Sequence, residues 1–405
     1  MPESPYPMLS VEEALQVILQ AVSPLPPVRM PLPALLGLVL AEDVICQEDI
    51  PAFRASAMDG YAVIAGDGPA LSVLGEQTAG AAAMPALRPG TAVRIMTGAP
   101  LPEGADAVAP VEIAEEHGGQ VRLSRPVRRG ENVRPVGQDM ARGDLAVPMG
   151  TVLGPAEIGL MATLGQTEVL AYRRPRLAVM ATGDELVSPE SPLRPGQIRD
   201  SNSFALLAAA QAAGAETVNL GRLPDDEAKL RAALLDGLNR ADALVTSGGV
   251  SMGRKDLIKP LLAELGEILF GRVAVRPGKP FTFALVQGKP VFGLPGFPVS
   301  SLVSFELFVR PALRRMAGHS KLRRPEVKAR LSHAIHHPDD RTEFQRAHVV
   351  QKDGIFWAET TGLQASSRLK SLVGANALLR LPAGRPDFAA GDEVTAILIN
   401  QPEVD

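Results

Sequence analysis

The sequence predicts a multidomain protein of the α/β plus β class, with a doubly wound α/β domain, a β-rich insertion and a small C-terminal β domain. Three observations predict this fold class. The chain has 405 residues, more than a single hydrophobic core usually organises. Short Val-rich runs punctuated by Gly and Pro fill residues 45–149. Apolar strands and helical stretches then alternate over residues 176–316, and strand-like runs return after residue 323.

The first element is predicted to be a helix. Ser10 and Glu13 have the spacing of a capping box, which satisfies free N–H groups at a helix start. The apolar residues that follow fall on one helical face: Leu15, Ile18, Leu19 and Val22. A second helical piece is expected over residues 35–43, before the β-rich stretch.

The elements of the α/β domain follow from alternating apolar runs. Strands are expected at residues 177–182, 217–220, 243–246 and 291–294. Helices are expected at residues 203–213, 230–238 and 256–265, and a last helix should end at Met316. After a linker at residues 323–325, the runs 327–331, 344–350 and 394–399 predict the strands of the C-terminal β domain.

Composition excludes several classes of protein. Lys plus Arg number 41 against 45 Asp plus Glu, and the resulting charge of −4 argues against a general nucleic-acid binder. Cys46 is the only cysteine, so an intrachain disulfide or a cysteine-rich zinc site is ruled out. With no basic, apolar leader and no uninterrupted run of about 18 apolar residues, we expect a cytoplasmic protein without a membrane span.

Candidate binding segments follow the predicted strands, where ligands gather in open α/β sheets. They are residues 182–185, 223–226, 246–253 with Asp256, and 293–298. Carboxylates and glycines alternate in them, and glycines allow backbone N–H groups to approach an oxyanion closely. Neither a dinucleotide fingerprint nor a P-loop is present. Gly248 and Gly249 alone could equally form a tight turn.

Other candidate residues are ambiguous when taken singly. Arg276 and Lys279 sit on a proline-stiffened stretch that suits anion capture, although a solvated turn has the same pattern. Asp59, Asp139 and Thr97 could each belong to an ordinary loop. The scattered histidines disfavour imidazole-rich sites, whereas the loop carboxylates favour Mg²⁺ bridging carboxylate and phosphate oxygens. Such a site indicates phosphoryl or adenylyl chemistry.

Taken in order, these segments resemble the molybdopterin molybdenumtransferase family, the bacterial MoeA type that also forms the C-terminal part of gephyrin. The resemblance rests on residues 51–62, 94–102, 104–108, 130–134, 182–186, 247–253, 276–280 and 293–300. Phe297 stands where the family pattern often has Asn, and residues 365–371 depart from its usual Gly-Ser-rich spelling.

The resemblance implies an elongated chain of four domains. The first would combine residues 1–44 and 140–173, residues 45–139 would form the β-rich insertion, residues 174–318 the molybdopterin-binding α/β domain, and residues 323–405 the C-terminal β domain. A homodimer is also implied, with the site shared between two chains. Molybdopterin adenylyltransferase and molybdoenzyme apoproteins are possible further partners, and neither nucleic acid nor membrane is expected.

The implied reaction is the insertion of molybdate into the dithiolene of adenylylated molybdopterin, with Mg²⁺-dependent release of AMP. The catalytic residues implied are acidic: Asp59, Asp139, Glu185, Asp225 and Asp256. The substrate-binding residues implied are Thr97, Gly248, Gly249, Ser251, Arg276, Lys279, Pro295, Pro298, Arg346 and Ser371. Glu185 and Asp59 would be the metal ligands.

Three other functions compete with this interpretation. A molybdopterin adenylyltransferase would have a similar α/β domain but would lack the flanking domains. A non-catalytic scaffold like gephyrin would bind a peptide without releasing AMP. A general Mg²⁺-dependent phosphohydrolase would release AMP whether or not molybdate is present.

Overall fold

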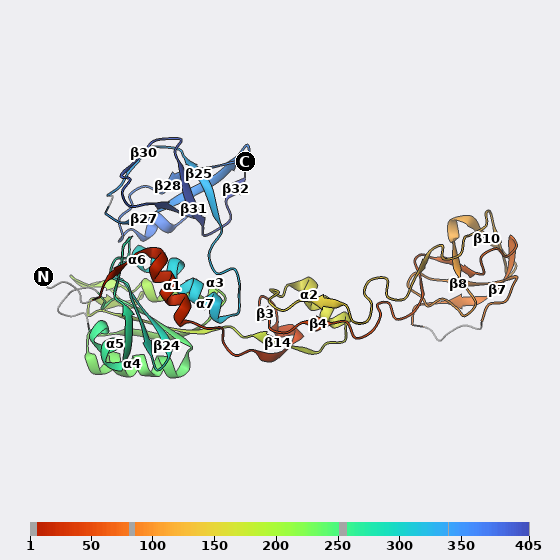
Figure 1. Ribbon diagram of the computed structural model, residues 1–405, viewed down its shortest axis with the longest axis horizontal. Coiled ribbons are helices and arrows are strands. Elements are labelled where there is room, and N and C mark those ends of the chain that lie inside the picture. Colours follow the sequence, from red (N-terminus) through yellow and green to blue (C-terminus); the bar gives the residue numbers. More distant parts are fainter. Residues whose placement is uncertain (1–5, 81–85, 251–256, 339, 405) are drawn as a thin grey trace. The chain divides into compact units, whose positions relative to one another are not determined.

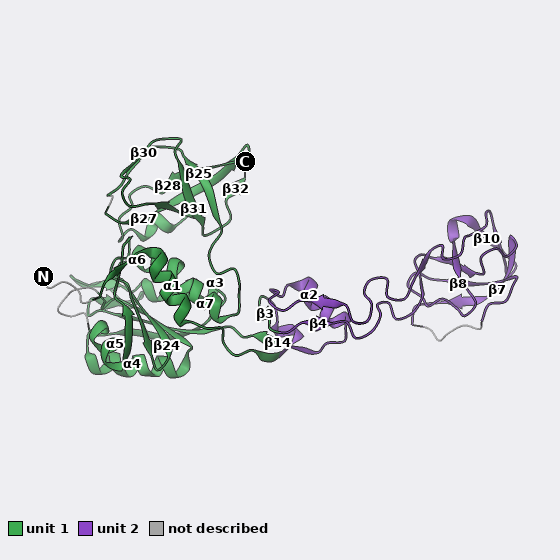
Figure 2. Ribbon diagram, in the orientation of Figure 1, with its two compact units in different colours: residues 1–29, 37–41, 170–405 green, residues 30–36, 42–169 purple. Residues whose placement is uncertain are grey.

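The computed structural model describes residues 6–80, 86–250, 257–338 and 340–404. It divides into two compact units, shown in Figure 2, one of residues 1–29, 37–41 and 170–405 and one of residues 30–36 and 42–169. The finer division into four domains stays a prediction. None of the helices in the described ranges combines the length and apolar character that spanning a membrane requires.

A six-stranded sheet forms the centre of the first unit, and its strand order is β18-β15-β19-β24-β23-β20. Figure 1 labels one of these strands, β24. Its strands are β15 (Arg176–Thr182), β18 (Glu216–Leu223), β19 (Ala243–Ser247), β20 (Gly266–Phe270), β23 (Thr282–Val286) and β24 (Lys289–Leu294). β18, β15, β19 and β24 run parallel, which confirms the four predicted strands. β23 and β20 add an antiparallel edge that the sequence analysis missed. The carboxyl ends of the four parallel strands therefore meet at one edge of the sheet.

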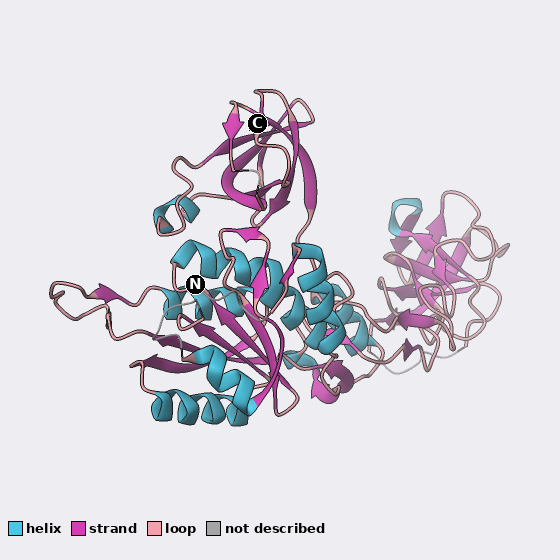
Figure 3. Ribbon diagram, turned by 60° about the vertical axis from the view of Figure 1, so that its left-hand side comes forward, coloured by secondary structure: helices cyan, strands magenta, loops and turns pink. Residues whose placement is uncertain are grey.

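Helices cover both faces of this sheet (Figures 1 and 3). α4 (Glu227–Arg240) and α5 (Ile258–Leu265) pack on the face that carries Ala178 and Met180. α3 (Asn202–Ala212), α6 (Pro298–Ser304), the π-helical turn η3 (Phe305–Val309) and α7 (Arg310–Met316) pack on the face of Leu177 and Val179. Two separate apolar cores result, because successive side chains of a strand point to opposite faces.

The N-terminal helix α1 (Val11–Ala21) is present as predicted. The Ser10 N–H donates to Glu13 Oε2 at 2.8 Å, and the Glu13 N–H donates to Ser10 Oγ at 3.2 Å. Ile18 is fully buried in the same core cluster as Phe305. The predicted helix over residues 35–43 is wrong. A short 3-10 turn η1 (Leu32–Ala34) is followed by strand β3 (Val39–Leu40), because Gly37 has a φ of +78°, outside the helical region.

The C-terminal part of the first unit is a closed five-stranded barrel. Its strands are β25 (Glu326–Leu331), β27 (Thr342–Lys352), β28 (Ile355–Thr360), β29 (Ala377–Leu381) and β31 (Glu393–Leu398). They pair in the order β27-β28-β25-β31-β29, and β29 pairs again with β27. This confirms the predicted β domain. The short strand β22 (Val275–Arg276) pairs with β27, so the segment that carries Lys279 is attached to the barrel.

The second unit contains the β-rich region that the sequence predicts. A six-stranded sheet has the order β10-β11-β7-β8-β6-β9. Its strands are β6 (Gly60–Val63), β7 (Ala70–Gln77), β8 (Thr91–Ile95), β9 (Ala107–Pro110), β10 (Ala114–His117) and β11 (Gln120–Leu123). The rest of the unit includes β4 (Val44–Ile45), β5 (Ala55–Ser56), β12 (Val133–Arg134), β13 (Leu145–Val147) and α2 (Pro155–Thr163).

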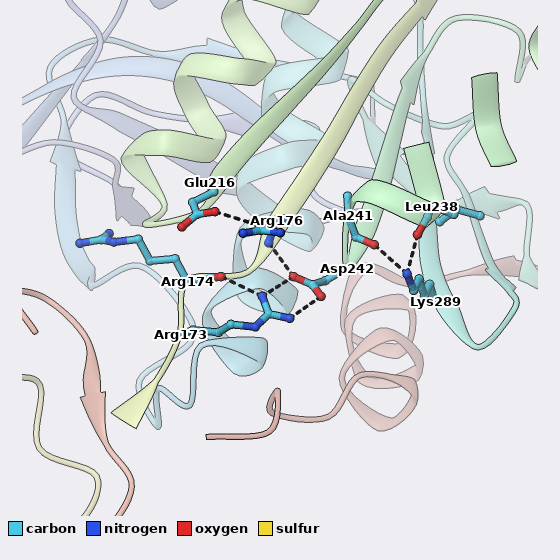
Figure 4. A network of polar contacts seen from close by, with 8 residues as sticks. All are labelled: Arg173, Arg174, Arg176, Glu216, Leu238, Ala241, Asp242 and Lys289. Carbon is cyan, nitrogen blue, oxygen red and sulfur yellow. Dashed lines mark hydrogen bonds and ion pairs between the residues drawn. The ribbon is translucent and has the colours of Figure 1, made fainter. Parts of the chain in front are cut away.

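A polar network ties together the amino ends of the parallel strands in the first unit (Figure 4). Both terminal nitrogens of Arg173 donate to the Asp242 carboxylate at 2.7 Å, and the Arg176 N–H donates to it at 2.8 Å. Lys289 Nζ donates to the Ala241 carbonyl at 3.0 Å. Asp242 thus joins the starts of β15 and β19 at the edge opposite the strand-end loops.

We predict that Asp242→Asn lowers the free energy of unfolding of this domain by about 1–3 kcal/mol, since the charged hydrogen bonds from Arg173 are lost. The Asp242 side chain is only 17% exposed. Native-state hydrogen exchange of the β15 and β19 amides measures the effect. Glu216→Gln is the matched control, because the Arg176–Glu216 pair is more than half exposed on both sides and should contribute about 0–1 kcal/mol. Equal losses of unfolding free energy in Asp242→Asn and Glu216→Gln would contradict the stabilising role of Asp242.

This stabilisation should depend on pH in the acid range. Burial alone would raise the pKa of Asp242, but hydrogen bonds and charge from Arg173 and the Arg176 N–H outweigh it and hold the pKa below its ordinary value of 3.8. A carboxyl group whose pKa is lower in the folded than in the unfolded state stabilises the fold at pH values above the unfolded-state pKa. This stabilisation is lost as the pH falls through the folded-state pKa. In urea unfolding, the difference between wild type and Asp242→Asn should stay constant from neutral pH to about pH 5 and shrink below about pH 4. If the difference in unfolding free energy between wild type and Asp242→Asn grew on acidification, the stabilising role of the Asp242 carboxylate would be refuted.

Candidate active site

The carboxyl ends of the parallel strands open into a cleft of about 750 Å³ in the first unit. Each of the four parallel strands contributes predicted site residues or their neighbours to its lining. These residues are Thr182, Gly183 and Glu185 after β15, Asp225 after β18, Gly248 and Gly249 after β19, and Pro295 to Phe297 after β24. The 276–280 segment and residues 364–366 also line it. The structure therefore brings together the strand-end segments that the sequence singled out.

The two glycines after β19 occupy positions that strain any residue with a Cβ atom. Gly248 has a φ of +94° and Gly249 a φ of +70°. A Cβ atom at Gly248 would lie 2.6 Å from the Thr182 carbonyl oxygen, and one at Gly249 would lie 2.7 Å from a side-chain carbon of Ile258. The Gly248 N–H donates to the Leu294 carbonyl at 3.1 Å, so it joins this loop to β24 and is not free for a ligand.

Carboxylates gather at the ends of β15 and β18. Thr182 Oγ1 donates to Asp225 Oδ1 at 2.6 Å, and the Asp225 N–H donates to Asp184 Oδ1 at 3.1 Å. The Glu185 carboxylate folds over Gly183, where a Cβ atom would lie only 2.6 Å from Glu185 Oε2. Glu185 is exposed and Asp225 half-buried, so both carboxylates remain accessible from the cleft.

These carboxylates fit one mode of metal binding. Within the described ranges, no three acidic, His or Cys side chains come close enough to hold a metal ion among themselves. Mg²⁺, however, is usually held by one or two carboxylates together with substrate phosphates and water. Glu185 and Asp225 supply hard oxygen atoms of that kind. The arrangement suits a cation that arrives with a phosphate-bearing substrate.

Cations line the same cleft. Arg276 Nη2 donates to Asp340 Oδ1 at 2.9 Å, so part of its charge is balanced within the protein. Lys279 is exposed, and no described residue pairs with its ammonium group. Gly278, with a φ of +123°, packs so closely that a Cβ atom would lie 2.7 Å from Ser304 Oγ. Lys279 is thus an exposed cation without a charged partner among the described residues, carried on a tightly packed backbone.

Arg346 and Ser371 lie outside the lining. Arg346 is fully buried, its Nε donates to Ser371 Oγ at 3.0 Å, and its Nη2 lies 3.4 Å from the Ala365 carbonyl oxygen. Burial lowers the pKa of Arg346 to about 10, although the nearby Glu343 acts in the opposite direction. Its Nη1 has no hydrogen-bond partner in the described part of the chain. The pair holds the loop of residues 364–366 and keeps one spare donor.

The second unit contains its own acidic site residues. Both the N–H and the Oγ1 of Thr97 donate to Asp59 Oδ1 at 2.7 Å. These hydrogen bonds, the side-chain one first, hold the pKa of Asp59 below its usual range. The exposed Asp139 pairs with Arg134 at 3.0 Å. Asp59 and Thr97 are thus in direct contact within the second unit.

The remaining predicted residues are placed as follows. Pro298 is the first residue of α6, where its fixed φ suits a helix start. Ser251 and Asp256 lie outside the described residues.

The sequence analysis missed Asn202, which joins two loops of the cleft. Asn202 Nδ2 donates to Ser247 Oγ at 2.8 Å and to the Gly296 carbonyl at 2.7 Å. Ser247 Oγ in turn lies 3.3 Å from Ser301 Oγ, which also donates to the Pro295 carbonyl. The sequence did contain a signal for Asn202. It is a polar residue at the start of α3, the helix that follows the strand β15.

Comparisons with known proteins cover almost the whole chain. The family model for the MoeA N-terminal region (domain I and II) matches residues 9–165, that for a probable molybdopterin binding domain matches residues 178–315, and that for the MoeA C-terminal region (domain IV) matches residues 328–399. Molybdopterin molybdenumtransferase 2 of Mycobacterium tuberculosis is 39% identical over 401 residues, covering 96% of this chain and 98% of that protein.

Two further matches agree with these. Molybdopterin molybdenumtransferase of Haemophilus influenzae is 36% identical over 363 residues, covering 88% of this chain and 90% of that protein. The crystal structure of a molybdopterin biosynthesis MoeA protein from Pyrococcus horikoshii covers 98% of this chain and 100% of its own, with a TM-score of 0.83 and 33% identity.

We predict that Asn202→Ala loosens both loops, because the side chain donates to each of them. Hydrogen exchange of the Gly248 amide should become faster, and inorganic pyrophosphate should bind about tenfold more weakly in calorimetry. Asn219→Ala is the control, since Asn219 Oδ1 accepts a local hydrogen bond from the Gly221 N–H and Asn219 does not line the cleft. Unchanged exchange at Gly248 together with wild-type pyrophosphate affinity would rule out the bridging role.

Proposed function

Since this chain belongs to the molybdopterin molybdenumtransferase family, enzymes of molybdenum cofactor biosynthesis, we propose that it transfers molybdate to the dithiolene of adenylylated molybdopterin and releases AMP with the help of Mg²⁺. One observation carries the proposal. The cleft at the strand ends combines an exposed cation, Lys279, with the accessible carboxylates of Glu185 and Asp225. A substrate that contains a pyrophosphate link, and that brings a divalent cation with it, needs both kinds of group.

The cationic side of the cleft binds the oxyanions. Lys279 holds a phosphate or molybdate oxygen, and the fixed backbone around Gly278 limits the entropy lost on binding. Arg276 contributes the charge that Asp340 leaves uncompensated. Arg346 and Ser371 stay predicted binding residues, and they hold the loop of residues 364–366 that lines the cleft.

The acidic side holds the cation and orients water. Bound Mg²⁺ would offset negative charge on the phosphates as the pyrophosphate link is cleaved. Glu185 would hold it, while Asp225, fixed by Thr182, orients the attacking water. Asp59 stays a predicted metal ligand, and its lowered pKa supports the role because a ligand must be ionised. The homodimer with a shared site also stays a prediction.

The other readings have less support. An adenylyltransferase would need only the α/β domain, whereas relatives named molybdenumtransferases match this chain over nearly its whole length. A scaffold without catalysis has no need for two accessible carboxylates and an exposed lysine in one cleft. A general phosphohydrolase is separated from the proposal by the role of molybdate.

We expect AMP release from adenylylated molybdopterin to require both Mg²⁺ and molybdate. Asp59→Asn and Glu185→Gln should each lower its kcat/KM by about 10²-fold or more, because each removes the charge of a predicted Mg²⁺ ligand. The measurement is AMP by chromatography, with protein-bound molybdenum by mass spectrometry.

Controls exist in both units. Asp67→Asn changes a carboxylate of the second unit that accepts from the Gly90 N–H, and Glu190→Gln changes an exposed carboxylate outside the cleft lining. Both should retain wild-type turnover. AMP release without molybdate would indicate a hydrolase, and no release at any protein concentration would indicate a scaffold or a different substrate.

A further inference from the structure

Phe297 is an exposed aromatic side chain in the lining of the cleft. It is 59% exposed, although large apolar side chains are usually buried. Within the described ranges it makes no ring contact with another aromatic residue and no cation–π contact. An exposed ring that lines a ligand-sized cleft, and that has no aromatic or cationic partner among the described residues, is a candidate for contact with a ligand.

The backbone around Phe297 is held from both sides. On one side, the Gly296 carbonyl accepts from Asn202 Nδ2 at 2.7 Å. On the other side, the Phe297 carbonyl accepts the Ser301 N–H at 3.0 Å in the first turn of α6. Pro298 fixes the next residue, and the Val299 N–H donates to the Ser366 carbonyl at 3.1 Å. Only the two side-chain torsions of Phe297 remain free, so little entropy is lost when the ring is covered.

The cleft around this ring is part charged and part apolar. Lys279 and Arg276 supply cations, while Leu186 and the 55% exposed Ile198 supply apolar surface in the same cleft. The substrate named under the proposed function has matching parts, namely an anionic pyrophosphate link and flat heteroaromatic rings. Lys279 suits the link, and an exposed benzyl ring suits a flat ring.

We propose that Phe297 stacks on a flat heteroaromatic ring of the substrate, either the adenine or the pterin, and so determines specificity for ring-bearing pyrophosphates. The inference rests on the proposed function for the identity of the ligand. It concerns only binding of the ring, so it is tested separately from metal insertion. Stacking on any such ring requires a flat face on the protein, which a branched aliphatic side chain of similar volume does not have.

The test is calorimetric binding of three probes to the full-length protein: AMP, pterin and inorganic pyrophosphate, which has no ring. Phe297→Leu should weaken binding of one ring probe roughly 5- to 150-fold and leave pyrophosphate binding unchanged. Loss with AMP alone identifies the adenine as the stacked ring, and loss with pterin alone identifies the pterin. Phe297→Trp, which enlarges the flat face, should bind that probe at least as tightly as wild type.

Phe204→Leu is the matched control, because Phe204 is 56% exposed on α3 but does not line the cleft. It should bind all three probes as wild type does. The stacking role is overturned if Phe297→Leu binds both ring probes normally, if pyrophosphate binding falls in parallel, or if wild type binds neither ring probe. A failure of molybdate-dependent AMP release, with the ring-selective loss intact, would instead overturn the proposed function alone.

Discussion

The close approach of the loop after β19 to the end of β15 is the constraint on which the site depends. Gly248 lies against the Thr182 carbonyl at a distance that excludes a Cβ atom, and its φ of +94° excludes other residues as well. The same Thr182 donates through Oγ1 to Asp225. One contact between strand ends therefore fixes both the glycine loop and a carboxylate, and Asn202 adds the loop after β24.

The two ends of the parallel strands have different roles: the amino ends carry stabilising contacts, and the carboxyl ends carry the candidate binding residues. At the amino ends, Asp242 accepts hydrogen bonds from Arg173 and Arg176 and holds the strands together. At the carboxyl ends, neutral side chains such as Asn202 and Thr182 fix the loops together with backbone hydrogen bonds, and Lys279 has no charged partner among the described residues. An open α/β sheet is suited to this division because its parallel strands place all loops of one kind at one edge.

The sequence predicted features that depend on local pattern. Apolar runs were sufficient for the four parallel strands, and the Ser10–Glu13 spacing for the start of α1. Residues 35–43 were predicted as helix because their apolar pattern was weighed without the left-handed Gly37. Asn202 was missed because its partners lie 45 and 94 residues away in the chain. Burial of Arg346 is likewise set by tertiary packing, which no motif records.

The most direct test of the account is to map where adenylylated molybdopterin binds the full-length protein, by hydrogen exchange with and without the ligand. If the substrate binds in the cleft, protection appears in the strand-end loops around Gly248 and Gly296 and in the segment that carries Lys279. Protection confined to the amino-end network around Asp242, or absent from these loops at saturating ligand, would contradict the placement of the substrate in the cleft.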